Sequence, residues 1–344
     1  MPKRWRAALA VAFLAVTAWA AVHASAAGVS WTAAFGLIGG LPWIETAGLG
    51  LVWIGGLCVH TVVLSASLPG LSRRRALTLN LTGSAVSNVL PLGGLAGTAV
   101  NLAMTRTWGH SRLDFARFVV VSKACDVIAK LLMPAVALVA LLAAGVLSPA
   151  AGGAWVLPAA GAFAAGALVL WALCGRATPL LRVVSLAARA GSWTVRRPIG
   201  ATWPAAVSAL LAGTDVLVRR RRAALALGMA GYWLAQGALL WCCLLAVGLR
   251  PHPAVVFAAL VAERLLTLLV VTPGGAGPAE AGMVTVLLAL GVDPTAALAG
   301  VLLFRAFVFA AEIPVGAAVG AGWWAARRRN ARGPGGSGVP PVCA

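Results

Sequence analysis

Long uninterrupted apolar runs constrain this chain more than any other feature. A helix needs roughly 20 consecutive apolar residues to cross the hydrocarbon core of a bilayer, and runs of that length recur along the 344 residues. Hydrophobic residues make up 61% of the chain and charged residues only 10%, so a soluble globule would leave much of its apolar surface in water. We therefore expect an all-α integral membrane protein.

The apolar runs predict about six full spans. They lie at Ala7–Ala27, Leu49–Leu68, Phe118–Leu147, Ala154–Cys174, Ala223–Gly248 and Thr295–Trp324. Two further apolar stretches, residues 79–105 and 254–290, contain proline and glycine near their middle. Because these residues interrupt regular helices, we expect two broken or re-entrant segments.

Basic residues are distributed unevenly and predict the topology. Most of the 27 lysines and arginines lie near the two termini or in loops that the spans would place on one side, and only Arg250 lies in a loop on the other side. Loops rich in Lys and Arg stay in the cytoplasm during membrane insertion. We therefore expect a protein of the bacterial cytoplasmic membrane with both termini on the cytoplasmic side. The net charge of +19 is thus a topological signal, and nucleic acid is not an expected partner.

The spans define one polytopic membrane domain over residues 1–326, followed by a basic Gly/Pro tail over 327–344 that we expect to be disordered. An arginine-rich cytoplasmic loop is expected over 175–222. Its apolar stretch Pro204–Val218 fits an interfacial helix on the inner leaflet and equally an ordinary solvated connector.

A weak internal repeat relates the two broken segments. The first unit runs from Pro91 to a span that is expected to end at Pro134, and the second runs from Pro273 to a span that is expected to end at Pro314. The topology gives the two units opposite orientations, one entering from the cytoplasm and the other from the exterior. Such inverted repeats are typical of secondary transporters, whose sites form at broken helices near the midplane.

The two breaks are candidate sites because proline and glycine free backbone groups that must find partners in a membrane. In the first break, a half-helix that begins after Gly97 would direct its backbone N–H groups toward a phosphate. A packing kink without a ligand is the alternative. The second break resembles a phosphate-binding loop only superficially, because no Lys-Ser/Thr follows its glycines. The break residues are Asn88, Pro91, Gly93, Gly94, Gly97, Pro273, Gly274, Gly275 and Gly277.

Eight ionisable residues lie within apolar segments, where a charge costs at least about 2.5–3.5 kcal/mol and usually faces a partner or an aqueous cavity. Lys123, Asp126 and Lys130 are spaced three and four residues apart, so they share one helical face. Arg305 and Glu312 are seven residues apart and likewise share a face. Structural ion pairs between spans and a polar pathway for a charged headgroup both fit this pattern. The eight are Lys123, Asp126, Lys130, Glu263, Arg264, Glu280, Arg305 and Glu312.

No catalytic constellation emerges. The four histidines lie in separate loops or spans, and no serine has the context of a nucleophile elbow. We interpret His60 as a buried histidine whose polar atoms have partners within the protein, and we expect no enzymatic activity, no cofactor and no metal ion.

At the two breaks the chain resembles the transmembrane, flippase-type region of lysylphosphatidylglycerol synthases. The matching stretches are Asn88–Asp126 and Glu263–Glu280, and the likeness extends over roughly residues 5 to 325. An acidic or basic residue commonly follows the glycines of the first break in that family, whereas this chain has Ala96, Thr98 and Ala99 there. No acyltransferase-like domain follows within the 344 residues, so the resemblance is to a stand-alone member without the synthase domain.

The resemblance implies translocation of aminoacylated phosphatidylglycerol, as in the full-length bifunctional members of the family, and assigns no single role to stand-alone members. Our leading hypothesis is a non-enzymatic transporter or flippase for a lipid or lipid-linked substrate. Its expected partners are membrane lipids with anionic or aminoacylated phospholipid or polyprenyl-linked headgroups. The second hypothesis is a non-catalytic scaffold or accessory subunit of a cell-envelope lipid or glycan synthesis complex. A third, an integral-membrane transferase that uses the buried acids as general bases, requires an acceptor pocket of which the sequence gives no sign.

Overall fold

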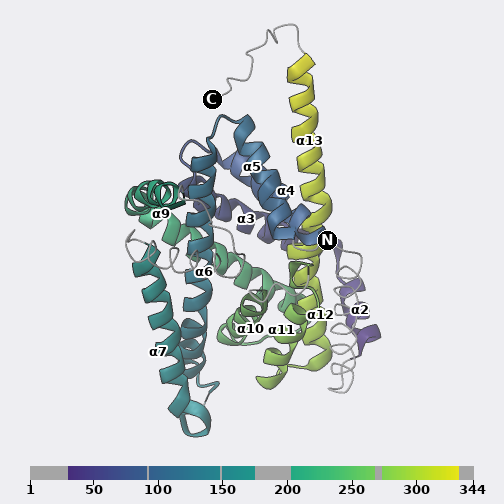
Figure 1. The fold of residues 1–344 in the computed structure, drawn as a ribbon. Coiled ribbons are helices and arrows are strands. Elements are labelled where there is room, and N and C mark those ends of the chain that lie inside the picture. Colours follow the sequence, from purple (N-terminus) through teal and green to yellow (C-terminus); the bar gives the residue numbers. More distant parts are fainter. Residues whose placement is uncertain (1–29, 91–92, 148, 175–202, 268–272, 333–344) are drawn as a thin grey trace, which may run out of the picture.

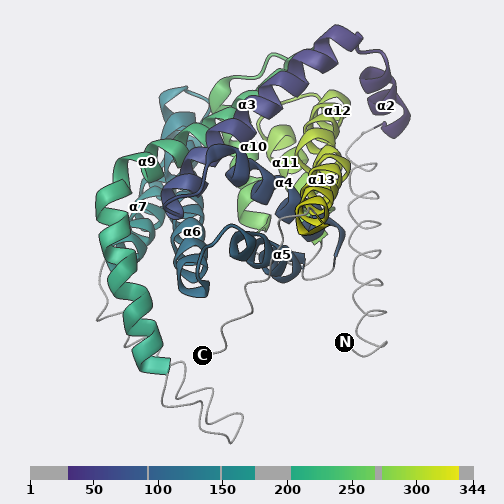
Figure 2. The same cartoon turned by 90° about the horizontal axis from the view of Figure 1, so that it is seen from above.

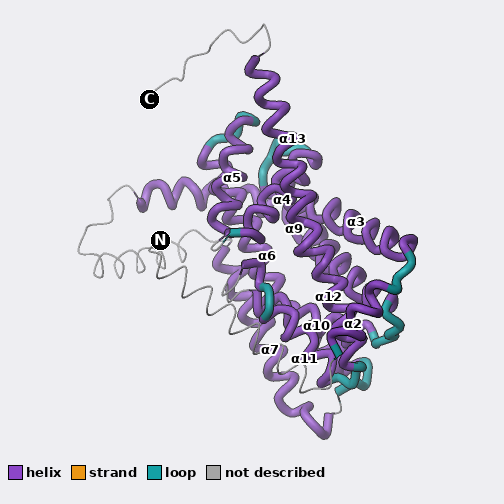
Figure 3. Tube along the Cα trace, turned by 90° about the vertical axis from the view of Figure 1, so that its right-hand side faces the viewer, coloured by secondary structure: helices purple, strands orange, loops and turns teal. Residues whose placement is uncertain are grey.

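The computed structural model describes residues 30–90, 93–147, 149–174, 203–267 and 273–332, and these ranges contain helices and no strand (Figures 1 and 3). Four helical stretches are long and apolar enough to cross a membrane. They are Trp43–Ser67, Arg112–Ala143, Gly213–Ala246 and Pro294–Arg329. The expected all-α membrane architecture is therefore confirmed, while the expected span Ala7–Ala27 lies outside the described residues.

Polar side chains cap the start of several helices in the N-terminal half. Ser72 caps one helix through the N–H of Arg75, and Ser111 and Asp114 form a reciprocal capping box on another. These caps satisfy backbone donors that would otherwise lack partners. The helices are α2 (Trp31–Gly39), α3 (Trp43–Ser67), α4 (Arg73–Val89), α5 (Gly93–Thr107), α6 (Arg112–Ala143) and α7 (Pro149–Cys174).

Proline marks the start of several helices in the C-terminal half, where its missing N–H is harmless. A single turn of 3₁₀-helix and a stretch of π-helix interrupt the regular pattern there. The elements are α9 (Trp203–Ala246), α10 (Pro253–Leu266), η2 (Pro273–Gly275), α11 (Pro278–Ala289), α12 (Pro294–Arg305), η3 (Ala306–Ala311) and α13 (Glu312–Arg332).

The two broken segments occupy opposite ends of the bundle. In Figure 1 the α4–α5 hairpin lies in the upper half and α10 and α11 lie in the lower half. The combined stretch from α12 to α13 runs through both halves, and 56% of its most apolar window is buried. This stretch is the central helix against which both hairpins pack.

Small residues allow the closest helix contacts, as is common in membrane proteins. Gly56, Gly228 and Gly231 lie where α3 meets α9, and a Cβ on Gly231 would lie 3.0 Å from Val59. Gly316 likewise lets α13 approach the backbone of α4. Large apolar side chains such as Leu227 are instead exposed on the outside, where the membrane would cover them.

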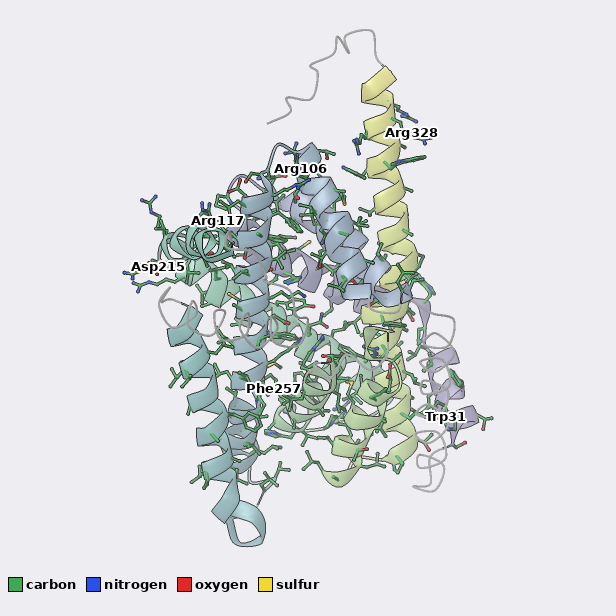
Figure 4. The ribbon with its side chains drawn as sticks, viewed as in Figure 1. Trp31, Arg106, Arg117, Asp215, Phe257 and Arg328 are labelled. Atoms are coloured by element: carbon green, nitrogen blue, oxygen red, sulfur yellow. The ribbon has the colours of Figure 1, made fainter. Side chains whose placement is uncertain are left out.

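Basic side chains gather toward one end of the molecule. Figure 4 places Arg106, Arg117 and Arg328 in the upper part and Trp31 and Phe257 in the lower part. This separation along the bundle axis matches the charge asymmetry in the sequence.

Three predicted helix boundaries are wrong. Pro134 lies inside α6 and Pro314 lies inside α13, so neither proline ends a span. A proline is tolerated inside a membrane helix because neighbouring helices and other donors can satisfy the backbone carbonyl that its missing N–H leaves free. The second half of the first broken segment begins at Gly93 rather than after Gly97, because glycine does not prevent helix formation where close packing favours it.

The predicted arginine-rich loop and tail are partly helical. Residues 203–222 belong to α9, a continuous helix of 44 residues, so Pro204–Val218 is not a separate element but the N-terminal part of α9. Figure 2 shows the N-terminal part of α9 projecting beyond the other helices. The helix α13 extends to Arg332, so the first part of the expected tail over 327–344 is ordered. Residues 175–202 and 333–344 lie outside the described residues.

Substitution of Gly316 by leucine is expected to lower the free energy of unfolding by about 1–3 kcal/mol. A Cβ at Gly316 would lie 2.8 Å from Ala85 and would also overlap the Leu81 carbonyl, so α13 would have to move away from α4. Thermal unfolding of the detergent-purified protein, followed by helical circular dichroism, measures the change. Gly322→Leu on the same helix meets nothing within 4 Å and serves as the control. Equal unfolding temperatures for the two variants would contradict the close packing.

Candidate functional site

One cavity of about 1150 Å³ contains residues from both breaks and from most of the helices. This volume slightly exceeds the roughly 300–1,000 Å³ that is typical of pockets for small ligands. Six of the predicted break residues line it, from the C-terminal end of α4 to the turn η2. These are Asn88, Gly93, Gly94, Gly97, Gly274 and Gly275.

The two breaks touch each other inside this cavity. The helix α4 packs against η2, and a Cβ placed on Gly274 would lie 3.1 Å from the side-chain oxygen of Asn88. Gly274 has a φ of 59°, a left-handed conformation that glycine adopts without strain. A side chain there would also overlap Phe309. Gly274 thus lets the second break reach the end of the first.

The first break is closed by a local hydrogen bond and a close backbone contact. The hydroxyl of Ser87 donates to the carbonyl of Gly93 at 3.1 Å, which links the end of α4 to the start of α5. A Cβ at Gly97 would lie 2.6 Å from the carbonyl oxygen of Gly83. The glycines of this break therefore bring α4 and α5 together.

Arg305 is the centre of an ion network that holds the second break. Its Nε donates to Oε1 of Glu280 at 2.6 Å, its Nη1 to Oε1 of Glu263 at 3.3 Å, and its Nη2 to the carbonyl of Gly274 at 2.9 Å. The side chain of Arg305 is only 8% exposed and that of Glu263 only 1%. Charges buried to this degree are stable only when paired and hydrogen-bonded.

Each carboxylate of the network also has a second partner. Oε2 of Glu280 accepts the backbone N–H of Gly277 at 2.7 Å, which caps the start of α11. Oε2 of Glu263 lies 2.7 Å from Nε of Arg264. The Arg264 guanidinium lies 4.6 Å from the ring centroid of Trp233, a cation–π contact. The network therefore connects α9, α10, α11 and α12 to the turn η2.

A row of three charges on α6 faces the same cavity. Lys130 and Asp126 form an ion pair at 3.0 Å, one helical turn apart as their spacing predicts. Lys123 lies one turn before Asp126 and also lines the cavity. Its ammonium makes no ion pair with any residue of the described ranges.

Glu312 occupies the far side of the π-helix that follows Arg305. Its side chain is buried and lines the cavity, near enough to Arg264 and Arg305 to interact with their charges. The π-helix η3 spans Ala306–Ala311, and such irregular turns are frequent at functional sites.

The structure brings together most of the predicted site. Seven of the eight predicted charges line the cavity. The eighth, Glu280, does not line it but accepts a hydrogen bond from Arg305, which does. Structural ion pairing, one of the two interpretations of these charges, is thus present at Arg305. Pro273 and Gly277 do not line the cavity, and Pro91 lies outside the described residues.

Sequence reasoning missed several uncharged polar residues of the cavity wall. His60, expected to be buried with its polar atoms satisfied, is half-buried and its Nδ1 makes no hydrogen bond with a described residue. Its ring lines the cavity and stacks on Tyr232 with centroids 4.1 Å apart. The spacing of three and four residues between polar side chains of α4 is the signal that could have revealed this wall. The missed residues are His60, Asn80, Ser84, Asn101, Tyr232 and Gln236.

Metal ligands are not clustered in this site. Across the described parts of the chain, no group of three His, Cys, Asp or Glu side chains could hold a metal ion.

Arg305→Met is expected to lower the free energy of unfolding by about 3–5 kcal/mol, since two buried carboxylates lose their cation. Adding Glu263→Gln and Glu280→Gln should recover part of this loss, because no unpaired charge remains. Thermal unfolding of the three proteins measures both effects, with Arg329→Met at the exposed end of α13 as the control. A single variant as stable as the control would exclude Arg305 as the centre of the network.

Comparison with known proteins places the chain in a family. The family model described as the lysylphosphatidylglycerol synthase TM region matches residues 5–316. No curated protein and no solved structure matches the chain. The matched range contains both breaks, the Arg305 network and the charged row of α6. The chain therefore belongs to the family of lysylphosphatidylglycerol synthase transmembrane regions.

Proposed function

We propose that this protein transports a lipid or lipid-linked substrate across the bacterial cytoplasmic membrane as a flippase, without catalysing a chemical reaction. The observation that carries the proposal is the single cavity in which two helix breaks meet among buried charges. A headgroup crossing the membrane needs such a polar chamber, because its charge would otherwise enter hydrocarbon. The acyl chains would stay in the bilayer.

The arrangement of the two hairpins supports an inverted repeat. The α4–α5 hairpin and the α10–α11 hairpin approach the cavity from opposite ends of the bundle (Figure 1). Arg106, Arg117 and Arg328 lie toward the end that carries α5 (Figure 4), and basic residues are retained in the cytoplasm. We therefore assign that end to the cytoplasm and the end with α10 and α11 to the exterior.

The cavity also favours transport over the alternative of a non-catalytic scaffold. A scaffold would need no hollow interior, and its breaks would be filled by packed side chains. Here Gly94 lines the cavity and a Cβ placed on it would meet nothing within 4 Å. The transferase hypothesis would require an acceptor positioned beside a free carboxylate. Glu263 and Glu280 are engaged by Arg305, so the buried acid that this alternative would have to use is Glu312.

Ser122→Trp is expected to slow flipping of fluorescent phosphatidylglycerol in proteoliposomes by about tenfold, the effect of roughly 1.4 kcal/mol on the barrier. Ser122 lines the cavity on α6, so an indole there would narrow the path of the headgroup. Val139→Trp is the matched control, because Val139 lies on the same helix and is 51% exposed on the outside. Absence of flipping by the wild-type protein, or equal rates for both variants, would contradict the proposed function.

The topology predicts which residues an impermeant maleimide reaches. In a variant without the six native cysteines, Arg250→Cys should be labelled in intact spheroplasts, whereas Arg106→Cys should be labelled only after the membrane is permeabilised. Both positions are exposed: Arg106 lies in the last helical turn of α5, and Arg250 lies in the loop before α10. Labelling of both from the same side would disprove the inverted arrangement.

A further inference from the structure

The charges of the cavity are not balanced locally. On α10, α11 and α12 the two arginines share Glu263 and Glu280, and Glu312 lies within reach of both. On α6 the only carboxylate facing the cavity, Asp126, is paired with Lys130 at 3.0 Å. One unneutralised cation therefore remains on the α6 wall.

That cation is Lys123, whose ammonium is available to a ligand. Lys123 is exposed and lines the cavity, and within the described residues it has no carboxylate at ion-pair distance. A lysine within a membrane helix usually faces a partner or a polar path. Since no carboxylate of the described ranges supplies a counter-charge at ion-pair distance, we expect the partner to come from the contents of the cavity.

A second cation lines the same cavity. Arg264, on α10, faces this cavity together with Lys123 of α6. Its Nε lies 2.7 Å from Glu263, whereas its Nη2 is buried and makes no hydrogen bond with any described residue. Arg264 therefore has a donor left for a ligand.

We propose that Lys123, assisted by Arg264, binds the phosphate ester of the transported headgroup. The phosphate supplies the anion that the α6 wall lacks, and a lysine binds it as a compact point charge with three donors. The cavity then selects substrates by their phosphate, and Arg305 serves as the structural cation that holds the second break. The identification of the ligand as a headgroup rests on the proposed function; the phosphate site itself does not.

Lipid binding to the detergent-purified protein tests this assignment. Dioleoylphosphatidic acid and dioleoylphosphatidylglycerol carry a phosphate, and dioleoylglycerol has the same acyl chains without one. The wild type should bind both phospholipids more tightly than dioleoylglycerol. Lys123→Gln should weaken phospholipid binding about tenfold, the effect of losing one charge-assisted hydrogen bond, and should leave dioleoylglycerol binding unchanged.

Two variants separate the local charge from general effects. Lys123→Arg keeps the cation and should bind the phospholipids nearly as well as the wild type. Arg112→Gln removes an exposed cation from the same helix outside the cavity and should have no effect. Phospholipid binding by Lys123→Gln at wild-type affinity would overturn the proposal, as would an equal loss for dioleoylglycerol.

Inorganic phosphate distinguishes the two sources of the ligand. We expect millimolar phosphate to leave phospholipid binding unchanged, because the acyl chains contribute to affinity. Displacement that depends on Lys123 would instead assign the site to soluble phosphate and overturn the headgroup assignment. The binding experiment does not depend on transport. If phospholipid binding depends on Lys123 but the protein does not flip lipid, only the proposed function is contradicted. Flipping that Ser122→Trp blocks and Lys123→Gln leaves unchanged would contradict only this inference.

Discussion

The three-way contact of Arg305 is the interaction on which the rest of the site depends. Its guanidinium is almost fully buried and bonds to two carboxylates and one backbone carbonyl. A buried cation without these acceptors would be strongly unfavourable, so the positions of Glu263, Glu280 and Gly274 are tied to one another. The second break can exist in a membrane because Arg305 satisfies the backbone oxygen that the break exposes.

Glycines in the breaks and in the central helix allow the helices to approach one another closely. Gly274 brings the second break to Asn88 at the end of the first, and Gly316 brings the central helix to α4. Without these contacts the two hairpins would be separate kinks at opposite ends of the bundle. With them, the hairpins share one polar cavity, and the π-helix between Arg305 and Glu312 lies in its wall. This is the geometry that a secondary transporter places near the midplane.

Two kinds of charge in the cavity have different roles. Arg305 and Lys130 have carboxylates at bonding distance and support the architecture. Lys123 has none among the described residues and faces the cavity. The sequence alone makes these three residues equivalent, because each is a basic residue in an apolar segment. Only the presence or absence of a counter-charge in space separates a structural cation from one that is free to bind a ligand.

Features that depend on local composition could be predicted from the sequence. The membrane class follows from transfer free energies summed over each run, the breaks follow from proline and glycine, and the pair Asp126–Lys130 follows from helical spacing. Boundaries were less predictable, because a proline such as Pro134 ends a helix only if its neighbours do not compensate. The tertiary structure alone decided that Arg305 bonds to Glu263, 42 residues away, and that His60 joins the wall. These contacts depend on how the helices pack. Packing brings together residues that are far apart along the chain, and their separation in the sequence does not indicate that they will meet.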